Sequence, residues 1–247
     1  MRSYNLWIGG RDVAAEGGAG TVRRSPAHGA ELARFALGSA ADLDRAVAAA
    51  RAAQESWSDR NAMERAALLT RLADLMQAGL DRLAEIEAEE VGKPIRDGRG
   101  EIAHSINLTR YAAALAWEIP GRAQTHHGTS ALGIVSYEPI GVVGMITPWN
   151  FPAVTLFQKL PYALAAGCTV VIKPSEMTGG TTLEVARLAT EAGFPDGVIN
   201  VATGRGSVVG NAIVDHPDVD MISFTGSTEV GRAIGEKCAR QIKRAGL

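Results

Sequence analysis

Four short clusters in the second half of the chain, at 147–152, 173–176, 203–210 and 224–228, combine residue types that bind ligands. In the first cluster, the side-chain amide of Asn150 can donate a hydrogen bond to a developing oxyanion. Asparagine is also common in turns and helix caps, and this reading stays open. In the second, Lys173 and Glu176 can bond sugar hydroxyls, and Glu176 would repel a 2′-phosphate. The alternative there is a helix cap at Ser175 with ordinary surface charges.

The third and fourth clusters are glycine turns that precede helical patterns. The spacing Gly204-x-Gly206-x-x-x-Gly210 differs by one residue from the dinucleotide fingerprint, and it lacks the Gly-Lys-Ser/Thr of a phosphate-binding P-loop. Gly226 and Ser227 precede a helix whose free amides and dipole suit a diphosphate. Each cluster alone fits a plain connection. Four of them at one edge of one sheet predict a dinucleotide site.

The elements that must position these clusters are short apolar runs followed by helical patterns. Strands are predicted at 142–146, 169–172, 198–201 and 221–224, and helices at 153–166, 181–192, 207–214 and 227–242. Four strand–helix units in series predict right-handed crossovers and an α/β fold with a doubly wound parallel sheet. In such sheets ligands bind beyond the carboxyl ends of the strands, where all four clusters lie.

The chain before this sheet is predicted to be helical. Ser39 and Asp42 have capping-box spacing before a helix over 43–57, and Asn61 and Glu64 repeat that signal before a leucine-rich stretch that Gly79 weakens or divides. A further helix is expected over about 101–117. We therefore expect a helical amino-terminal part at 1–119, an arm at 120–140 and a Rossmann-like part at 141–247.

Composition excludes several other functions. The 25 Lys+Arg and 27 Asp+Glu give a net charge of −2, which argues against nucleic-acid and anionic-membrane surfaces. Cys168 and Cys238 match no disulfide framework or metal spacing, and the first residues lack a signal-peptide pattern, so a cytoplasmic location is expected. Prolines and glycines interrupt the uncharged stretch 139–158, which favours a strand, a loop and a helix over a membrane span. We interpret His126-His127 as an exposed pair and expect no metal.

Together the clusters resemble those of the NAD(P)-dependent aldehyde dehydrogenase family. The resemblance is carried by Trp7-Ile8-Gly9-Gly10, Thr147-Pro148-Trp149-Asn150-Phe151-Pro152, Gly167-Cys168-Thr169-Val170-Val171-Ile172-Lys173-Pro174-Ser175-Glu176 and Phe224-Thr225-Gly226-Ser227. It implies that Asn150 belongs to the oxyanion hole and that Phe151, Thr155 and Gln158 point towards an aldehyde tunnel. It also implies a cofactor, NAD in preference to NADP. The residues it assigns to that cofactor are Thr147, Trp149, Lys173, Ser175, Glu176, Gly206, Gly210, Phe224, Gly226, Ser227 and Val230.

The family's reaction needs a cysteine thiolate that attacks the aldehyde and a glutamate that activates water to hydrolyse the thioester. In the family, the glutamate opens a Glu-Leu-Gly-Gly motif that normally follows a segment like 243–247, and the nucleophile lies further on. By this comparison Cys168 and Cys238 are non-catalytic. The resemblance thus implies the amino-terminal half of a dehydrogenase without its catalytic domain, whose full-length form is a homodimer or homotetramer paired through 120–140. The alternative is an NAD-binding fragment or module without catalytic activity.

Overall fold

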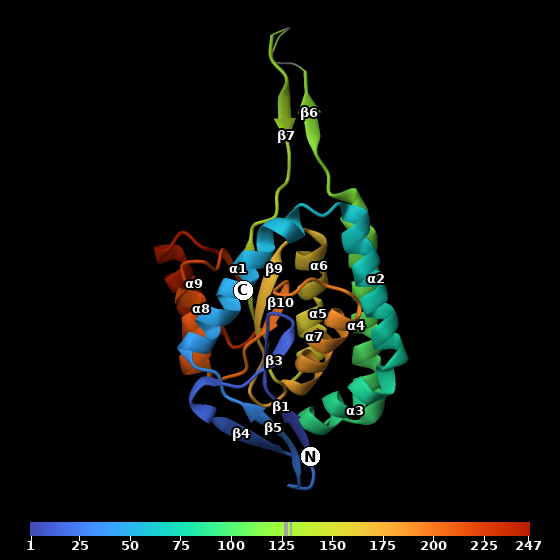
Figure 1. Cartoon of the computed structure of the whole chain (residues 1–247), viewed down its shortest axis with the longest axis vertical. Helices are drawn as coiled ribbons and strands as arrows, with labels where there is room; N and C mark the ends of the chain where they lie inside the picture. The colour runs from blue at the N-terminus through green and yellow to red at the C-terminus, as the bar shows by residue number, and fades with distance from the viewer. Residues whose placement is uncertain (126–127, 129) are drawn as a thin grey trace.

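The computed structural model describes residues 1–125, 128 and 130–247, so the His126-His127 pair lies outside the described residues. A seven-stranded sheet with the order β12-β11-β8-β9-β10-β2-β3 forms the centre (Figure 1). Its parallel strands are β8 (Val142–Ile146), β9 (Thr169–Lys173), β10 (Ile199–Val201), β11 (Met221–Phe224) and β12 (Arg244–Gly246). The doubly wound α/β fold predicted from the strand–helix repeats is confirmed.

Helices cover both faces of this sheet. On one face lie α1 (Ala40–Ser58), α8 (Asn211–Asp215) and α9 (Thr228–Arg240), and on the other lie α5 (Pro152–Phe157), α6 (Leu160–Ala165) and α7 (Gly180–Glu191). Side chains of β8 alternate between the two cores: Val143 and Met145 pack with α5, α6 and α7, whereas Val142 and Ile146 pack with α1, α8 and α9. Burial on both faces explains why the strands are apolar throughout.

A further helical layer packs outside α5, α6 and α7. It contains α2 (Ala62–Ala78), α3 (Leu80–Val91) and α4 (Ile95–Leu115), which is followed by a short 3₁₀ turn, η2 (Ala116–Glu118). Gly79 separates α2 from α3, as the sequence indicated. The prediction of one helix over 153–166 is wrong, because α5 and α6 are separate. Pro161 explains the break, since proline within a helix removes an amide donor and clashes with the carbonyl four residues earlier.

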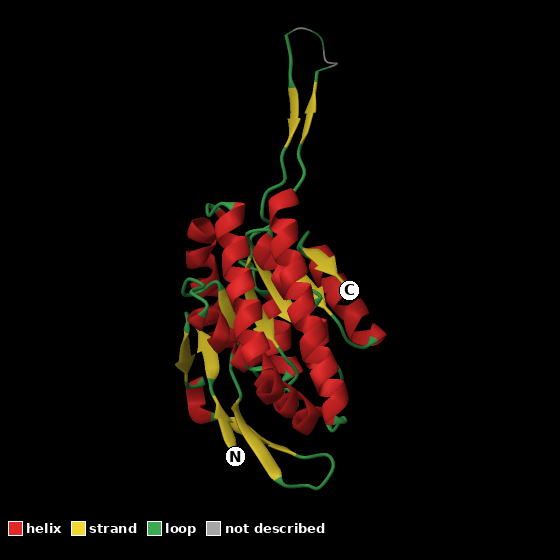
Figure 2. Cartoon of the chain, turned by 90° about the vertical axis from the view of Figure 1, so that its right-hand side faces the viewer, coloured by secondary structure: helices red, strands yellow, loops and turns green. Residues whose placement is uncertain are grey.

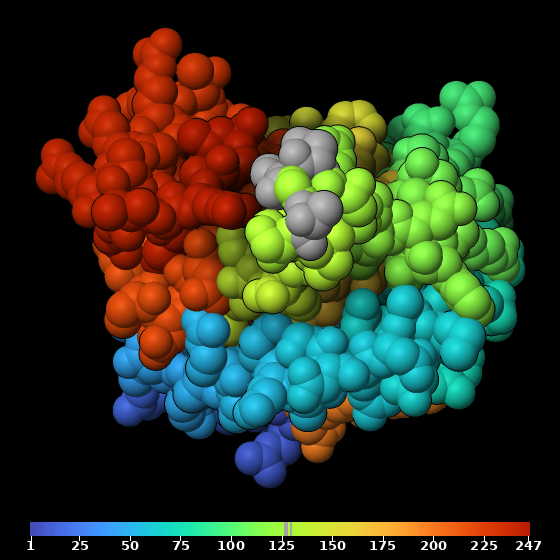
Figure 3. All heavy atoms as spheres, turned by 90° about the horizontal axis from the view of Figure 1, so that it is seen from above, coloured from blue at the N-terminus to red at the C-terminus, as the bar shows by residue number. Residues whose placement is uncertain are grey.

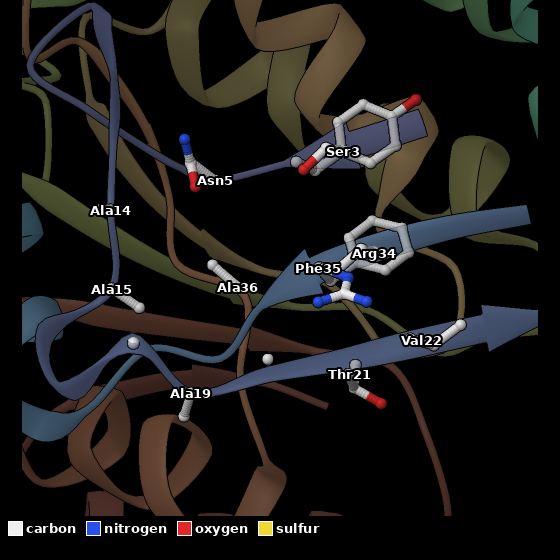
Figure 4. A pocket seen from close by; sticks show the side chains of 13 residues that line it. Ser3, Asn5, Ala14, Ala15, Ala19, Thr21, Val22, Arg34, Phe35 and Ala36 are labelled. Atoms are coloured by element: carbon white, nitrogen blue, oxygen red, sulfur yellow. The ribbon is translucent and has the colours of Figure 1, made fainter. Parts of the chain in front are cut away.

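The first 36 residues contain strands that the sequence analysis missed. Two of them, β2 (Leu6–Ile8) and β3 (Arg11–Val13), extend the main sheet in antiparallel orientation beside β10. The others, β1 (Arg2–Tyr4), β4 (Gly20–Arg24) and β5 (Glu31–Ala36), form a separate small sheet, and a 3₁₀ turn, η1 (Glu16–Gly18), precedes β4. A hollow of about 300 Å³ lies against this sheet, and its lining includes Ser3, Asn5, Thr21 and Arg34 (Figure 4). None of the predicted site residues lines it.

The predicted arm is a hairpin of β6 (Arg122–Gln124) and β7 (Gly133–Val135), which projects from the body (Figures 1 and 2). Viewed from above, it stands over the middle of the molecule, with the C-terminal segment to one side (Figure 3). Its apolar side chains are exposed, with Ile134 71% and Leu132 59% accessible. No helix among the described residues has the length and apolar character needed to cross a membrane.

The predicted capping box at the start of α1 is present. Asp42 is buried and accepts hydrogen bonds from the backbone amides of Ser39 (2.8 Å) and Glu16 (3.1 Å). Burial raises the pKa of Asp42, but these hydrogen bonds and the one from Arg45 outweigh it and hold the pKa below its usual range. The carboxylate therefore stabilises the folded chain fully above its unfolded-state pKa of about 4, and this contribution is lost as the pH falls through the lower folded-state pKa.

We expect Asp42→Asn to lower the free energy of unfolding by about 1–2 kcal/mol at pH 7. Urea unfolding at pH 7 and again below pH 4 measures the effect, and the difference from the parent chain should shrink at the lower pH. Glu64→Gln is the matched control, because Glu64 occupies the same third position of α2 but is exposed. An equal loss in both variants would contradict this role for Asp42.

Candidate functional site

The loop between β8 and α5 begins in register with the neighbouring strand. The amide of Thr147 donates to the Lys173 carbonyl at 3.3 Å, which continues the β8–β9 pairing beyond the strands. Thr147 is buried, and its hydroxyl has no hydrogen-bond partner among the described residues. Trp149, Asn150 and Phe151 follow and are all exposed, the two rings by about half their surface. The loop therefore presents two aromatic rings and one amide beyond the strand.

The loop after β9 holds a buried lysine. Lys173 is 5% exposed, and its ammonium lies 3.4 Å from Oε2 of Glu176. Burial lowers the pKa of Lys173, and the charge of Glu176 opposes that effect. Ser175 is no helix cap, because its hydroxyl accepts from the Met177 amide at 3.2 Å and α7 begins only at Gly180. The alternative of a Ser175 cap with ordinary surface charges is therefore wrong.

Two glycine-containing turns complete this edge of the sheet. At the start of α9, Ser227 caps the helix by accepting from the Val230 amide at 3.4 Å. Gly226 packs against the ring of Phe224, and a Cβ at this glycine would lie 2.4 Å from that ring. After β10, residues Gly206–Gly210 form a π-helical turn, η3, in place of the first part of the predicted helix over 207–214.

These loops enclose two adjoining hollows of about 450 and 380 Å³. Ile146, Lys173, Phe224 and Val230 line both of them. The predicted site residues in the first are Thr147, Trp149, Asn150, Lys173, Ser175, Phe224, Gly226, Ser227 and Val230. Gly206 and Gly210 join the shared residues in the second. Glu176 lies outside the lining and reaches the site through its ion pair with Lys173.

The three residues predicted to face a substrate occupy a different position. Within the described part of the chain, Phe151, Thr155 and Gln158 lie outside the lining of both hollows. The Thr155 hydroxyl donates to the Phe151 carbonyl one helical turn earlier at 2.8 Å, and Gln158 is exposed at the end of α5. Their role at a substrate stays a prediction.

Sequence reasoning missed several residues that the fold brings to this edge. Lys159 donates to the hydroxyl of Thr225, and burial lowers the pKa of this lysine. Lys93 donates to the Asn150 carbonyl at 3.1 Å. The face of α9 that carries the predicted Val230 also lines the second hollow with Ala233, Ile234 and Lys237, and their helical spacing makes them recognisable in the sequence. Lys93 had no comparable signal, because Asn150 lies 57 positions away in the chain.

Cys168 and Cys238 are both buried, and burial raises the pKa of each thiol. Neither lines either hollow as the structure describes them. Among the described residues, no group of three or more His, Cys, Asp or Glu side chains is arranged to hold a metal ion. The chemistry that this edge can perform is therefore hydrogen-bond donation from an amide, binding of hydroxyls by Lys173 and Glu176, and binding of an anion at the start of α9.

An open α/β sheet with a hollow at the carboxyl ends of its strands defines a class of ligand-binding folds. The chain belongs to the aldehyde dehydrogenase family, whose family model matches residues 13–247.

One curated relative is aldehyde dehydrogenase family 2 member C4 of Arabidopsis thaliana, 42% identical over 97% of this chain and 48% of the relative. Among solved structures, an NAD-dependent aldehyde dehydrogenase from Sinorhizobium meliloti superposes with a TM-score of 0.98 and 45% identity, over 100% of this chain and 50% of that one. An NAD⁺ complex of an aldehyde dehydrogenase from Bacillus cereus superposes with a TM-score of 0.96 and 40% identity, over 99% and 50% respectively. The chain thus spans about half the length of the curated relatives it matches.

The contact between Gly226 and Phe224 can be tested directly. We expect Gly226→Ala to displace the Phe224 ring and to lower the free energy of unfolding by about 1–2 kcal/mol, because the added methyl overpacks this corner. Gly210→Ala is the control from the same site, since a Cβ there meets no atom within 4 Å. Urea unfolding of both variants measures the difference. Equal stability of the two variants would show that Phe224 does not pack tightly on Gly226.

Proposed function

We propose that this chain is the NAD-binding half of an aldehyde dehydrogenase that oxidises an aldehyde to a carboxylate through a cysteine thioester. The observation that carries the proposal is the gathering of the predicted cofactor residues around two adjoining hollows at the carboxyl edge of the sheet. Family membership and the NAD⁺ complex of the Bacillus cereus relative support it.

The residues present fit a dinucleotide. The amides at the start of α9 and the Ser227 hydroxyl suit the pyrophosphate, and Trp149 lines the same hollow. Lys173 and Glu176 would hold the adenosine ribose through its hydroxyls, with Ser175 beside them. Gly206, Gly210 and the exposed Val230 side chain would border the adenine. When bound, NAD supplies the acceptor for the hydride.

Glu176 also favours NAD over NADP. Its carboxylate lies beside Lys173, where a 2′-phosphate would meet a negative charge. A 2′-hydroxyl, by contrast, can donate to the same carboxylate. The proposed cofactor is therefore NAD.

Asn150 is the proposed oxyanion residue. Its side chain is exposed at the end of β8, and its amide would donate to the thiohemiacetal oxygen when a cysteine thiolate attacks the aldehyde. We assign that nucleophile to neither Cys168 nor Cys238, because both are buried and neither lines the hollows. Phe151, Thr155 and Gln158 would face the aldehyde.

We also propose an assembly state and a cellular location for the protein. The hairpin with exposed Leu132 and Ile134 would pair subunits of a homodimer or homotetramer, because an exposed apolar ribbon favours a covering partner. The two free cysteines fit a reducing compartment, and we place the protein in the cytoplasm. The proposed ligands are NAD and a small aldehyde, without nucleic acid or membrane.

Titration of the chain with NAD and with NADP tests the cofactor assignment. Calorimetry should show that NAD binds more tightly, and Glu176→Ala should weaken NAD binding by about three- to tenfold, as expected for loss of a charge-assisted hydrogen bond. The same variant should narrow the difference between NAD and NADP. Glu236→Ala is the matched control, because it removes the same charge from an exposed position of α9. Unchanged affinities for both cofactors in Glu176→Ala would remove this residue from the site.

A dehydrogenase assay separates the two functions considered for this chain. If it binds NAD without catalysing oxidation, a panel of aldehydes should give no NADH above background, because neither cysteine lines the hollows. The assay follows NADH absorbance with the parent chain and with Cys168→Ala. Robust NADH production that Cys168→Ala abolishes would overturn our exclusion of this cysteine.

A further inference from the structure

The turn between α3 and α4 carries a lysine that points into the protein. Gly92 ends α3 in the left-handed conformation (φ +84°), and a Cβ at this position would lie 2.4 Å from Cγ of Pro26. Pro94 precedes the first residue of α4. Lys93, held between them, has only 11% of its side chain exposed. The turn therefore buries a cation whose long side chain usually stays in water.

The Lys93 ammonium joins the outer helical layer to the loop after β8. It donates to Oε1 of Glu101 on α4 and lies 3.7 Å from Oε1 of Glu87 on α3. On its other side it donates to the carbonyl oxygen of Asn150 at 3.1 Å. It also lies 4.7 Å from the centre of the Phe151 ring, within the range of a cation–π contact.

Glu87 fixes the start of α5, directly after this loop. This carboxyl group is fully buried; one oxygen accepts from the Ala153 amide at 3.3 Å, and the other accepts from the Thr181 hydroxyl at 3.0 Å. Burial raises the pKa of Glu87 to about 8, and the neighbouring Glu101 carboxylate adds to that effect. The cluster therefore packs the Lys93 ammonium against the carboxyl groups of Glu87 and Glu101, and burial disfavours a negative charge on Glu87.

We propose that Lys93 is a positioning residue that holds the backbone of Asn150, and with it the side-chain amide, in place at the pocket. The loop is held at both ends, at the carbonyl of Asn150 by Lys93 and at the amide of Ala153 by Glu87. Without the ammonium, the Asn150 carbonyl loses its donor and the Phe151 ring loses its cation. The catalytic consequence rests on the proposed function of Asn150, whereas the constraint on the loop does not.

Trp149, the neighbour of Asn150, provides the spectroscopic signal. The chain has four tryptophans, so labelling with 5-fluorotryptophan gives four ¹⁹F resonances, and Trp149→Phe assigns the one from the loop. We expect Lys93→Met to shift and broaden the Trp149 resonance in the absence of ligand. The resonance of Trp57, a fully buried residue of α1, should stay unchanged and reports an intact core.

Two further variants separate positioning from a general loss of stability. Lys93→Arg keeps a donor and a cation and should restore the parent Trp149 resonance. Arg99→Met is the matched control, because it removes a cation that bridges the same two helices by bonding Asp81 at 2.8 Å, at an exposed site. It should leave the Trp149 resonance unchanged.

Lys93→Met leaves the Glu101 carboxylate buried without its cation, which lowers stability. The double variant Lys93→Met/Glu101→Gln removes both charges, and we expect it to fold because no unpaired buried carboxylate remains, yet it still lacks the donor to Asn150. A displaced Trp149 resonance in the folded double variant supports positioning. An unchanged Trp149 resonance in that variant would overturn the proposal.

Addition of NAD to the same labelled chains distinguishes this inference from the proposed function. If the Trp149 resonance of the parent chain does not respond to NAD, this result contradicts the proposed cofactor site. The effect of Lys93→Met on the Trp149 resonance of the ligand-free chain can still be measured. The opposite result is also informative. If NAD shifts the Trp149 resonance of the parent chain but Lys93→Met leaves the ligand-free Trp149 resonance unchanged, the cofactor site is supported and the role of Lys93 is contradicted.

Discussion

The parallel pairing of β8 with β9 and β11 is the constraint on which the rest of the site depends. The amides of Thr147 and Thr225 continue these pairings past the strands, to the carbonyls of Lys173 and Ile146. The loops therefore leave the sheet side by side. Gly144 lies at the centre of β8, where a Cβ would meet side-chain atoms of Ile213 and Ile222 at 2.9 Å. The absence of a side chain there lets α8 approach the sheet closely, and α8 with the η3 turn forms part of the second hollow.

On the opposite face of the sheet from α8, helices α5 and α7 begin without a side-chain cap of their own, and α3 in the outer layer supplies acceptors to both. The cap positions of α5 and α7 are Phe151 and Gly179, and neither side chain accepts a hydrogen bond from its helix. Glu87 instead accepts from the first turn of α5, and Glu90 accepts from the first amide of α7 at 3.0 Å. Amides that are buried at a helix start need such acceptors. Burial raises the pKa of these carboxyl groups, to about 8 for Glu87 and about 7 for Glu90.

The sequence predicted what depends on local pattern and missed what depends on distant contacts. Strands 142–146 and 221–224, the capping box at Ser39 and the division at Gly79 follow from periodicity, cap chemistry and helix propensity, and the structure confirms them. The short strand β2 carries no alternation, because Leu6, Trp7 and Ile8 are all buried. Its place beside β10 is set by tertiary packing. The role of Lys93 carried no local signal, because its partner Asn150 is 57 positions away.

The break between α5 and α6 follows from the local sequence, and distant contacts then position the start of α5. Because Pro161 interrupts the helical hydrogen bonding, α5 is a short segment that does not continue into α6 and whose start is held by Glu87 and Lys93. Lys159, at the break, has non-helical dihedrals, and its ammonium donates to the hydroxyl of Thr225 in the loop after β11. Two lysines thus brace the segment from opposite ends. A continuous helix over 153–166 would tie its first turn to α6, whereas the observed break lets the α3–α4 turn determine where Asn150 stands.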